Sequence, residues 1–92
     1  MGTDLDEIRK NIDLADRELV AAFCRRMDLV REVAAYKIAN GLPVLQAGRE
    51  NVVLDKAEQA AGPEYGAYAR DLYTHVLRES RLMQQKMIDE SR

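Results

Sequence analysis

Six polar side chains that could do chemistry fall on or beside apolar stripes of helical spacing, where buried neighbours are expected. They are Arg9, Arg26, Lys37, Glu50, Ser80 and Gln84. Three cations and one carboxylate give this set a net charge of +2, so a dianionic ligand would balance it. Two guanidinium groups suit two carboxylates, each held through paired hydrogen bonds. Because burying so many polar groups without partners is costly, the set indicates a ligand-binding site.

Each of these residues, taken alone, also has a purely structural explanation. A single Arg or Lys beside a stripe usually extends its charged end to solvent. Glu50 could favour a helix N-terminus by its charge, and Ser80 and Gln84 could be satisfied core polar groups. Other arginines are expected on solvated faces, namely Arg25, Arg31, Arg70, Arg78 and Arg81. His75 has no partner ligand and is expected to be exposed and inert.

The elements that must position these groups are separated by two strong breaks, Gly41-Leu42-Pro43 and Gly62-Pro63. The breaks leave segments 4–40, 47–61 and 64–90, all rich in good helix formers and without strand alternation. The sequence therefore predicts an all-α fold of three helices, one of them very long. Thr3 or Asp4 can cap the first helix, and Gly41 fits the left-handed position that follows its end.

Apolar residues at steps of three, four and seven mark one face of each segment. In the first segment they are Leu5, Ile8, Ile12, Leu19, Phe23, Val30 and Val33. In the middle segment they are Val53, Leu54, Ala57 and Ala61, and in the last Tyr65, Tyr68, Leu72, Val76, Met83 and Met87. The faces predict helices that pack on one another or on a partner.

The first helix is too long for a compact monomer. Roughly 37 residues span about 55 Å, whereas a compact domain of this size has a radius of gyration of about 12 Å. The apolar stripe continues along the whole helix, so a partner must cover the projecting part. A second copy in two-fold symmetry is the simplest partner, and an intertwined helical homodimer is expected.

The same geometry divides the polar set. Arg26 and Lys37 point the same way along the helix, about 16 Å apart, and long side chains can converge from there. Arg9 lies about 25 Å from Arg26, too far to reach the same small molecule. If the long helices pair antiparallel, Arg9 of one copy reaches the site of the other.

Composition bounds the remaining possibilities. The 92 residues, 47% hydrophobic and 33% charged, predict one globular domain over 1–92. A net charge of −2 argues against nucleic-acid binding. With no membrane-length apolar run and no apolar leader after Met1, the sequence predicts a cytoplasmic protein without a membrane partner. Cys24 has no second cysteine for a disulfide, and no Cys/His cluster suggests a metal site.

Several runs of the chain, in this order and spacing, resemble the all-helical, AroQ-type chorismate mutases. The matching runs are Leu5-Asp6-Glu7-Ile8-Arg9-Lys10-Asn11-Ile12-Asp13 with Asp16, Arg25-Arg26-Met27, Val33-Ala34-Ala35-Tyr36-Lys37, Gly41-Leu42-Pro43-Val44, Arg49-Glu50 and Glu79-Ser80-Arg81-Leu82-Met83-Gln84. Each run is a weak signal, but together they cover nearly the whole chain.

The resemblance implies a chorismate mutase type II domain that forms a homodimer with two shared active sites. Each site would rearrange chorismate to prephenate without metal or cofactor. By the same resemblance, Arg26 and the partner's Arg9 would hold the two carboxylates of chorismate, and Ser80 would line that side. Lys37 and Gln84 would donate hydrogen bonds to the ether oxygen. Glu50 would bind the ring hydroxyl, and Arg49 would support the pocket.

One position departs from the family pattern, because Gln46 stands where many members have Asp near the hydroxyl side. This leaves the fine substrate preference open. A 4-amino-4-deoxychorismate mutase and an isochorismate-pyruvate lyase remain alternatives on the same fold, although such lyases lack the carboxylate at the position of Glu50. A non-catalytic helical dimerisation module is the alternative from another class.

Overall fold

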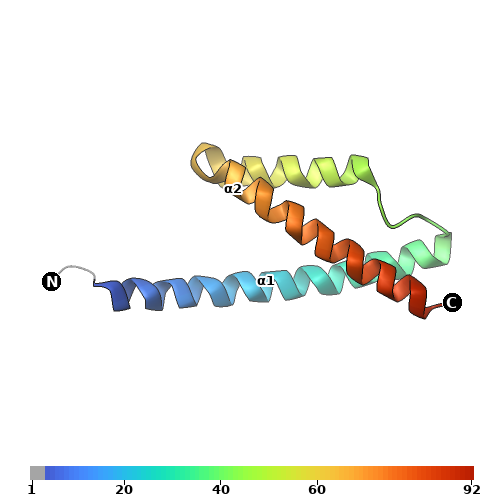
Figure 1. The fold of residues 1–92 in the computed structure, drawn as a ribbon, viewed down its shortest axis with the longest axis horizontal. Helices are drawn as coiled ribbons and strands as arrows, with labels where there is room; N and C mark the ends of the chain where they lie inside the picture. Colours follow the sequence, from blue (N-terminus) through green and yellow to red (C-terminus); the bar gives the residue numbers. More distant parts are fainter. Residues whose placement is uncertain (1–3) are drawn as a thin grey trace.

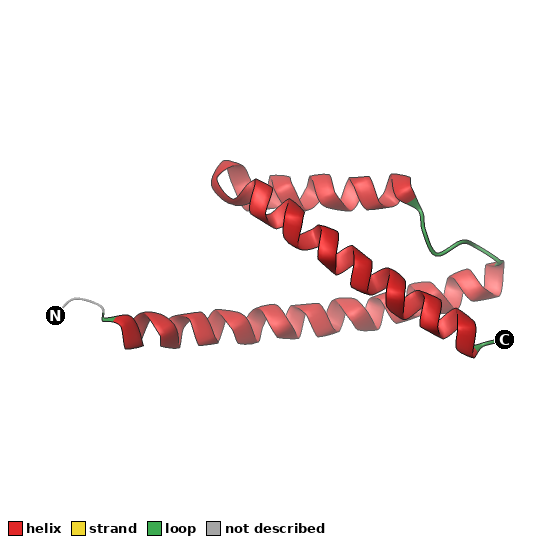
Figure 2. Ribbon diagram, viewed as in Figure 1, coloured by secondary structure: helices red, strands yellow, loops and turns green. Residues whose placement is uncertain are grey.

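The computed structural model describes residues 4–92, and these are almost entirely helical (Figure 2). Helix α1 covers Leu5–Asn40 and helix α2 covers Ala47–Glu90. A short connection, 41–46, joins them. The prediction of an all-α fold is confirmed, whereas the suggested Thr3 cap lies outside the described residues.

Both ends of α1 carry the signals that the sequence predicted. The Asp4 side chain accepts a hydrogen bond from the Glu7 backbone N–H at 2.9 Å and so caps the first turn. At the other end Gly41 is left-handed, with φ 65° and ψ 31°. The Leu42 N–H then donates to the Lys37 carbonyl at 2.9 Å, which satisfies a carbonyl that the helix leaves free.

The prediction of three helices was wrong, because the chain forms two. The break expected at Gly62-Pro63 is a sharp kink inside α2 rather than a loop between separate helices. Gly62 alone leaves helical geometry, with φ 82° and ψ 178°, a conformation that glycine adopts without steric cost. Pro63 has no backbone N–H, but this costs no hydrogen bond because N–H groups in the first turn after the kink have no partner within the helix. One residue is therefore enough to redirect the chain. We call 47–61 the first limb of α2 and 63–90 the second limb.

The two limbs fold back over one end of α1 (Figure 1). The second limb runs diagonally and crosses the C-terminal half of α1, and we call this contact region the crossing. The N-terminal half of α1 extends away from it. The molecule is accordingly elongated, with principal extents of 60 × 27 × 14 Å and a radius of gyration of 16.8 Å. That radius exceeds the value of about 12 Å expected for a compact domain of this length.

The core at the crossing is small and mixed in polarity. Its buried apolar residues are Val30, Ala34 and Leu77, and its buried polar residues are Lys37, Ser80 and Gln84. No large side chain among the described residues is fully buried. The most enclosed part of a single chain therefore contains as many polar as apolar residues.

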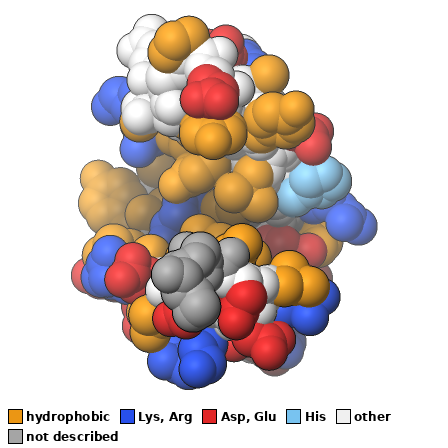
Figure 3. Space-filling model, turned by 90° about the vertical axis from the view of Figure 1, so that its left-hand side faces the viewer, with side chains coloured by type: hydrophobic (Ala, Val, Ile, Leu, Met, Phe, Trp, Pro, Cys, Tyr) orange, Lys and Arg blue, Asp and Glu red, His pale blue; other side chains and the backbone are white. Residues whose placement is uncertain are grey.

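Large apolar side chains remain exposed elsewhere. Residues 5–21 of α1 are all exposed, including the stripe residues Leu5, Ile8, Ile12 and Leu19. On the second limb Tyr65, Tyr68 and Leu72 are exposed as well. When the molecule is viewed from its N-terminal end, hydrophobic side chains gather across the middle of the visible face (Figure 3). Within residues 4–92, neither helix has a stretch long and apolar enough to cross a membrane.

Candidate active site

A cavity of about 540 Å³ opens between α1, the start of the first limb and the second limb. Of the seven residues that the sequence nominated, six line it: Arg26, Lys37, Arg49, Glu50, Ser80 and Gln84. Apolar side chains complete the wall, namely Leu29, Val30, Val33, Val44, Val53 and Leu77. The fold thus collects polar groups from three distant stretches of sequence around one space.

Arg26 is held on one side of this cavity by groups of the second limb. Its Nη1 donates to the Ser80 hydroxyl at 2.7 Å. That hydroxyl in turn donates to the Val76 carbonyl at 2.9 Å. The guanidinium carbon of Arg26 also lies 5.8 Å from the centre of the Tyr73 ring, within range of a cation–π contact. Ser80 therefore orients Arg26, and the remaining guanidinium donors are free for an anionic ligand.

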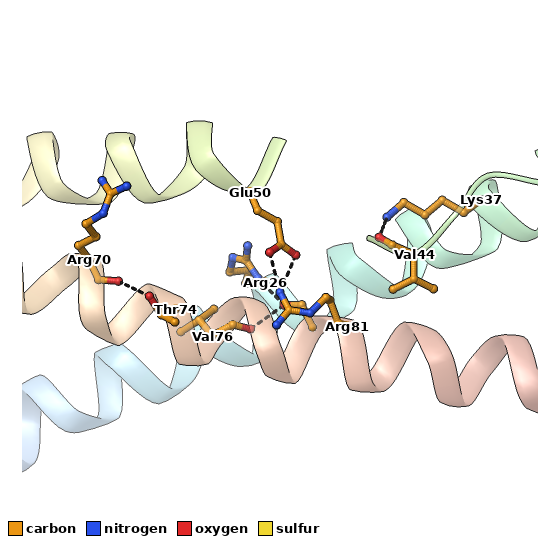
Figure 4. Close-up of polar contacts among 9 residues, drawn as sticks. Arg26, Lys37, Val44, Glu50, Arg70, Thr74, Val76 and Arg81 are labelled. Carbon is orange, nitrogen blue, oxygen red and sulfur yellow. Dashed lines mark hydrogen bonds and ion pairs between the residues drawn. The ribbon is translucent and has the colours of Figure 1, made fainter. Parts of the chain in front are cut away.

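Lys37 and Gln84 form the buried centre of the site. The Lys37 Nζ donates to the Gln84 Oε1 at 2.8 Å and to the Val44 carbonyl at 2.8 Å. The second bond ties the lysine to the connection between the helices (Figure 4). Burial lowers the pKa of Lys37, and the negative charge of Glu50 partly offsets that effect. Two of the three ammonium protons are engaged, which leaves one donor for a ligand.

Gln84 is fixed in the orientation that presents its amide nitrogen. Its Oε1 accepts from Lys37, and its Nε2 donates to no atom within residues 4–92. In the same part of the chain no buried side-chain nitrogen or oxygen lacks a partner. Nε2 therefore faces open space, where it can donate to a ligand in the cavity that Gln84 lines.

Glu50 projects from the first limb toward the second limb, where Arg81 meets it (Figure 4). The Arg81 Nη1 lies 2.6 Å from Oε1 and 2.8 Å from Oε2 of Glu50. The expectation that Arg81 lies on a solvated face was wrong, because its side chain is 34% exposed and bound to Glu50. Sequence spacing could not reveal the pair, since its members are 31 residues apart on different limbs.

Arg9 is the one predicted site residue that does not line the cavity of a single chain. It is exposed in the N-terminal half of α1 and is absent from the cavity wall. Gln46 does line the cavity, beside the residues of the first limb. No cluster of three or more His, Cys, Asp or Glu side chains that could hold a metal ion occurs in 4–92.

Comparison with known proteins identifies the family of this chain. The model of the family described as chorismate mutase type II matches residues 8–85, which is most of the chain. The chain belongs to the chorismate mutase type II family. The predictions of the all-helical chorismate mutase family and of an isomerase enzyme are therefore confirmed.

Three curated relatives agree with this assignment. The T-protein of Haemophilus influenzae is 34% identical over 87 residues, which is 95% of this chain and 22% of that protein. The 4-amino-4-deoxychorismate mutase of Streptomyces venezuelae is 32% identical over 79 residues, 83% of this chain and 76% of the relative. The intracellular chorismate mutase of Mycolicibacterium smegmatis is 31% identical over 78 residues, 85% and 71% of the two chains. No solved structure gives a significant match.

The chain thus spans about a fifth of the T-protein and about three quarters of the other two relatives. Within the family match lie all of the cavity residues nominated from the sequence, because 8–85 includes both Arg26 and Gln84. The charged groups on the wall are Arg26, Lys37, Arg49 and Glu50, three cations and one carboxylate with a net charge of +2. A chorismate mutase type II cavity of this charge suits a dianion.

Proposed function

We propose that this chain is one chorismate mutase domain that rearranges chorismate to prephenate. The observation that carries the proposal is the single cavity of net charge +2 in which Arg26, Lys37, Glu50 and Gln84 meet. Chorismate is a dicarboxylate with an ether oxygen and a ring hydroxyl. Arg26 would bind a carboxylate, Lys37 and Gln84 would donate to the ether oxygen, and Glu50 would accept from the hydroxyl. Ser80 and Arg49 would support these contacts.

The arrangement suits a reaction that needs positioning rather than a nucleophile. A [3,3] rearrangement requires the two reacting ends of the substrate to be held together in a compact chair, which binding groups at both ends can enforce. The C–O bond breaks ahead of C–C bond formation, so negative charge grows on the ether oxygen. The free Lys37 proton and the free Gln84 Nε2 are fixed donors that can stabilise that charge more in the transition state than in the ground state.

A homodimer with shared sites is part of the proposal. We call the exposed N-terminal half of α1, residues 5–21, its bare half. It carries Leu5, Ile8 and Ile12, which are 57%, 45% and 51% exposed. Covering this stripe by a second copy would remove apolar surface from water and bring the partner's Arg9 toward Arg26 of this chain. Sedimentation across a range of protein concentrations tests this, and a folded monomer at micromolar concentration would contradict it.

The activity is tested by adding the protein to chorismate, following the loss of its ultraviolet band and identifying prephenate as the product. Arg70→Gln is a matched control because Arg70 also pairs with carboxylates, Asp55 and Glu58, but lies outside the cavity. Parent and control should turn over chorismate equally, whereas Lys37→Ala should lose most activity. Binding of a bicyclic dicarboxylate that mimics the transition state would separate the enzyme from a dimerisation scaffold, which should ignore it.

A 4-amino-4-deoxychorismate mutase is the second candidate. One relative carries that name, and Gln46 lines the cavity where many family members have Asp. An isochorismate-pyruvate lyase is less well supported because Glu50 lines the cavity. Offering each substrate in turn and identifying the product distinguishes the three. A location inside the cell is also proposed, supported by the name of the relative from Mycolicibacterium smegmatis.

A further inference from the structure

Glu50 is the single carboxylate among the described residues that line the cavity. The neighbouring Gln46 is neutral, and the other charged groups on the wall are Arg26, Lys37 and Arg49. Any ligand group that needs a charged acceptor at this end must therefore use Glu50. Its side chain is 22% exposed, which leaves part of the carboxylate accessible.

Arg81 controls this carboxylate from outside the cavity. It does not line the wall, yet one of its guanidinium nitrogens lies between both oxygens of Glu50, at 2.6 and 2.8 Å. Such a contact fixes the plane of the carboxylate and neutralises its charge. Each oxygen has a second lone pair that can still accept a hydrogen bond from the cavity side.

The ion pair also keeps Glu50 away from the cations of its own site. Glu50 is near enough to Lys37 for its charge to raise the pKa of that lysine against the effect of burial. Within residues 4–92, however, no ion pair joins the two, and Lys37 binds Val44 and Gln84 instead. Without Arg81, the carboxylate would be drawn toward Lys37 or Arg49, and the donor meant for the ether oxygen would be diverted.

We propose that Arg81 is a positioning residue that makes the site prefer a neutral hydroxyl to an ammonium group on the ring of the substrate. The inference rests on the proposed function. A hydroxyl needs only an oriented acceptor, which the paired Glu50 supplies. A primary amine on an aliphatic ring carbon carries a proton at neutral pH, as lysine does. That extra cation would enter a site that already contains Arg26, Lys37 and Arg49, and it would meet a carboxylate whose charge Arg81 has neutralised.

The test compares kcat/KM for chorismate and for 4-amino-4-deoxychorismate in the parent and in two variants, Arg81→Gln and Arg81→Met. Both variants keep a long side chain at a partly exposed helical position, and Arg81→Met tests the same loss of charge if Arg81→Gln does not fold. The parent should prefer chorismate. Each variant should shift the ratio of the two kcat/KM values toward the amine by about tenfold, because a bare carboxylate attracts the ammonium group. Arg81→Lys should restore most of the parent ratio.

Two controls separate positioning from stability. Arg70→Gln removes an arginine that pairs with Asp55 and Glu58, and it should leave the ratio unchanged. In a Glu50→Gln background, adding Arg81→Gln should no longer shift the ratio, because Arg81 acts through the carboxylate. A merely structural Arg81 would lower both kcat/KM values together in either background.

The outcomes are distinct. A shifted ratio that depends on Glu50 supports the inference. An unchanged ratio in folded, active variants overturns the inference but leaves the proposed function standing. A parent that prefers the amine while still converting chorismate has the same two consequences. A parent that converts neither substrate overturns the proposed function and this inference together.

Discussion

The two halves of α1 belong to one uninterrupted helix but have opposite surroundings. In the N-terminal half, 5–21, every residue is exposed. In the C-terminal half, Val30, Ala34 and Lys37 are buried by the second limb of α2. A continuous stripe of apolar residues runs through both halves, so hydrophobicity does not explain the difference. The contrast teaches that this chain builds its own cavity at the crossing and leaves the apolar stripe of the other half exposed, where the proposed second copy would pack.

The largest expected effect tests whether Arg9, in the bare half of one copy, completes the cavity at the crossing of the other copy. Arg9→Ala and Arg26→Ala should each lower kcat/KM by about 10³ or more, since each leaves a substrate carboxylate without its charged partner. Mixing the two inactive variants should restore roughly a quarter of parent activity. Random exchange makes half of the dimers mixed, and each mixed dimer has one complete site of two.

A matched mixture provides the control. Arg26 and Lys37 line the same cavity, so mixing Arg26→Ala with Lys37→Ala should restore nothing. If exchange is verified and the Arg9 mixture also stays inactive, then Arg9 does not complete the site of a partner, and the proposed division of labour between the two halves of α1 fails.

The next effect lies wholly at the crossing. Gln84→Glu keeps the shape of the side chain but at neutral pH supplies only acceptors toward the ether oxygen. Losing such a donor costs about 10²–10³ in rate, and a repelling charge should cost at least as much. Activity should recover as the pH falls and the new carboxyl gains a proton, whereas the parent should show no such gain. Gln84→Ala should be slow at every pH, and a Gln84→Glu enzyme that matches the parent would exclude Gln84 from the chemistry.

A smaller effect concerns Lys37, whose pKa burial lowers below 10.5. The free enzyme should lose the ammonium proton at a lower pH than an ordinary lysine does. Above the lowered pKa of Lys37, kcat/KM should therefore fall by about tenfold per pH unit, and this fall should begin at a lower pH than an ordinary lysine would give. A bound dianion favours the charged lysine, so the corresponding fall in kcat should occur at higher pH. Lys37→Arg should abolish the alkaline fall in kcat/KM, and its persistence would assign the titration to another group.

The same pKa shift has a defined sign for stability. Between the lowered pKa of Lys37 and its ordinary value, the unfolded chain binds more protons than the folded chain. The contribution of this group to the free energy of unfolding therefore rises with pH across that window. Urea unfolding of the parent and of Lys37→Met at several alkaline pH values isolates the contribution.

The smallest expected effect returns to the bare half of α1, where the Asp4 cap is the local stabilising contact. Asp4→Ala should cost about 1 kcal/mol of helix stability. The cost should appear as faster amide hydrogen exchange in the first turns of α1, with exchange at the crossing unchanged. Asp4→Asn keeps a side-chain acceptor and should behave like the parent. Equal changes at both ends of α1 would show that the two halves do not differ as the burial pattern indicates.

Much of the fold could be predicted from local sequence because its signals are local. Asp4 caps α1, and Gly41 ends it in the left-handed conformation that was expected. Gly62-Pro63 was misread as a break between helices, since sequence cannot show that a single non-helical residue suffices to turn the chain. In the last segment the apolar stripe was offset from the buried face, because Ser80 and Gln84 occupy the centre of that face.

The candidate site was predictable to the extent that its polar residues interrupt apolar stripes. Arg26, Lys37 and Gln84 were found in this way and line one cavity. Arg81 was missed because it lies next to Ser80, off the stripe, and its partner Glu50 comes from the other limb. Pairing between limbs depends on the angle of the kink at Gly62, which no spacing in the sequence encodes.

The hydrogen bonds at the crossing also determine when the site forms as the chain folds. Arg26 meets Ser80 across 54 residues of sequence, and Lys37 meets Gln84 across 47. Each helix can form from local interactions on the microsecond scale, whereas these bonds require closure of much of the chain. The cavity is therefore completed late, by the same contacts that bury Val30, Ala34 and Leu77. The contacts that complete the cavity therefore depend on both helices being in place first, so the cavity is a property of the folded crossing and not of either helix alone.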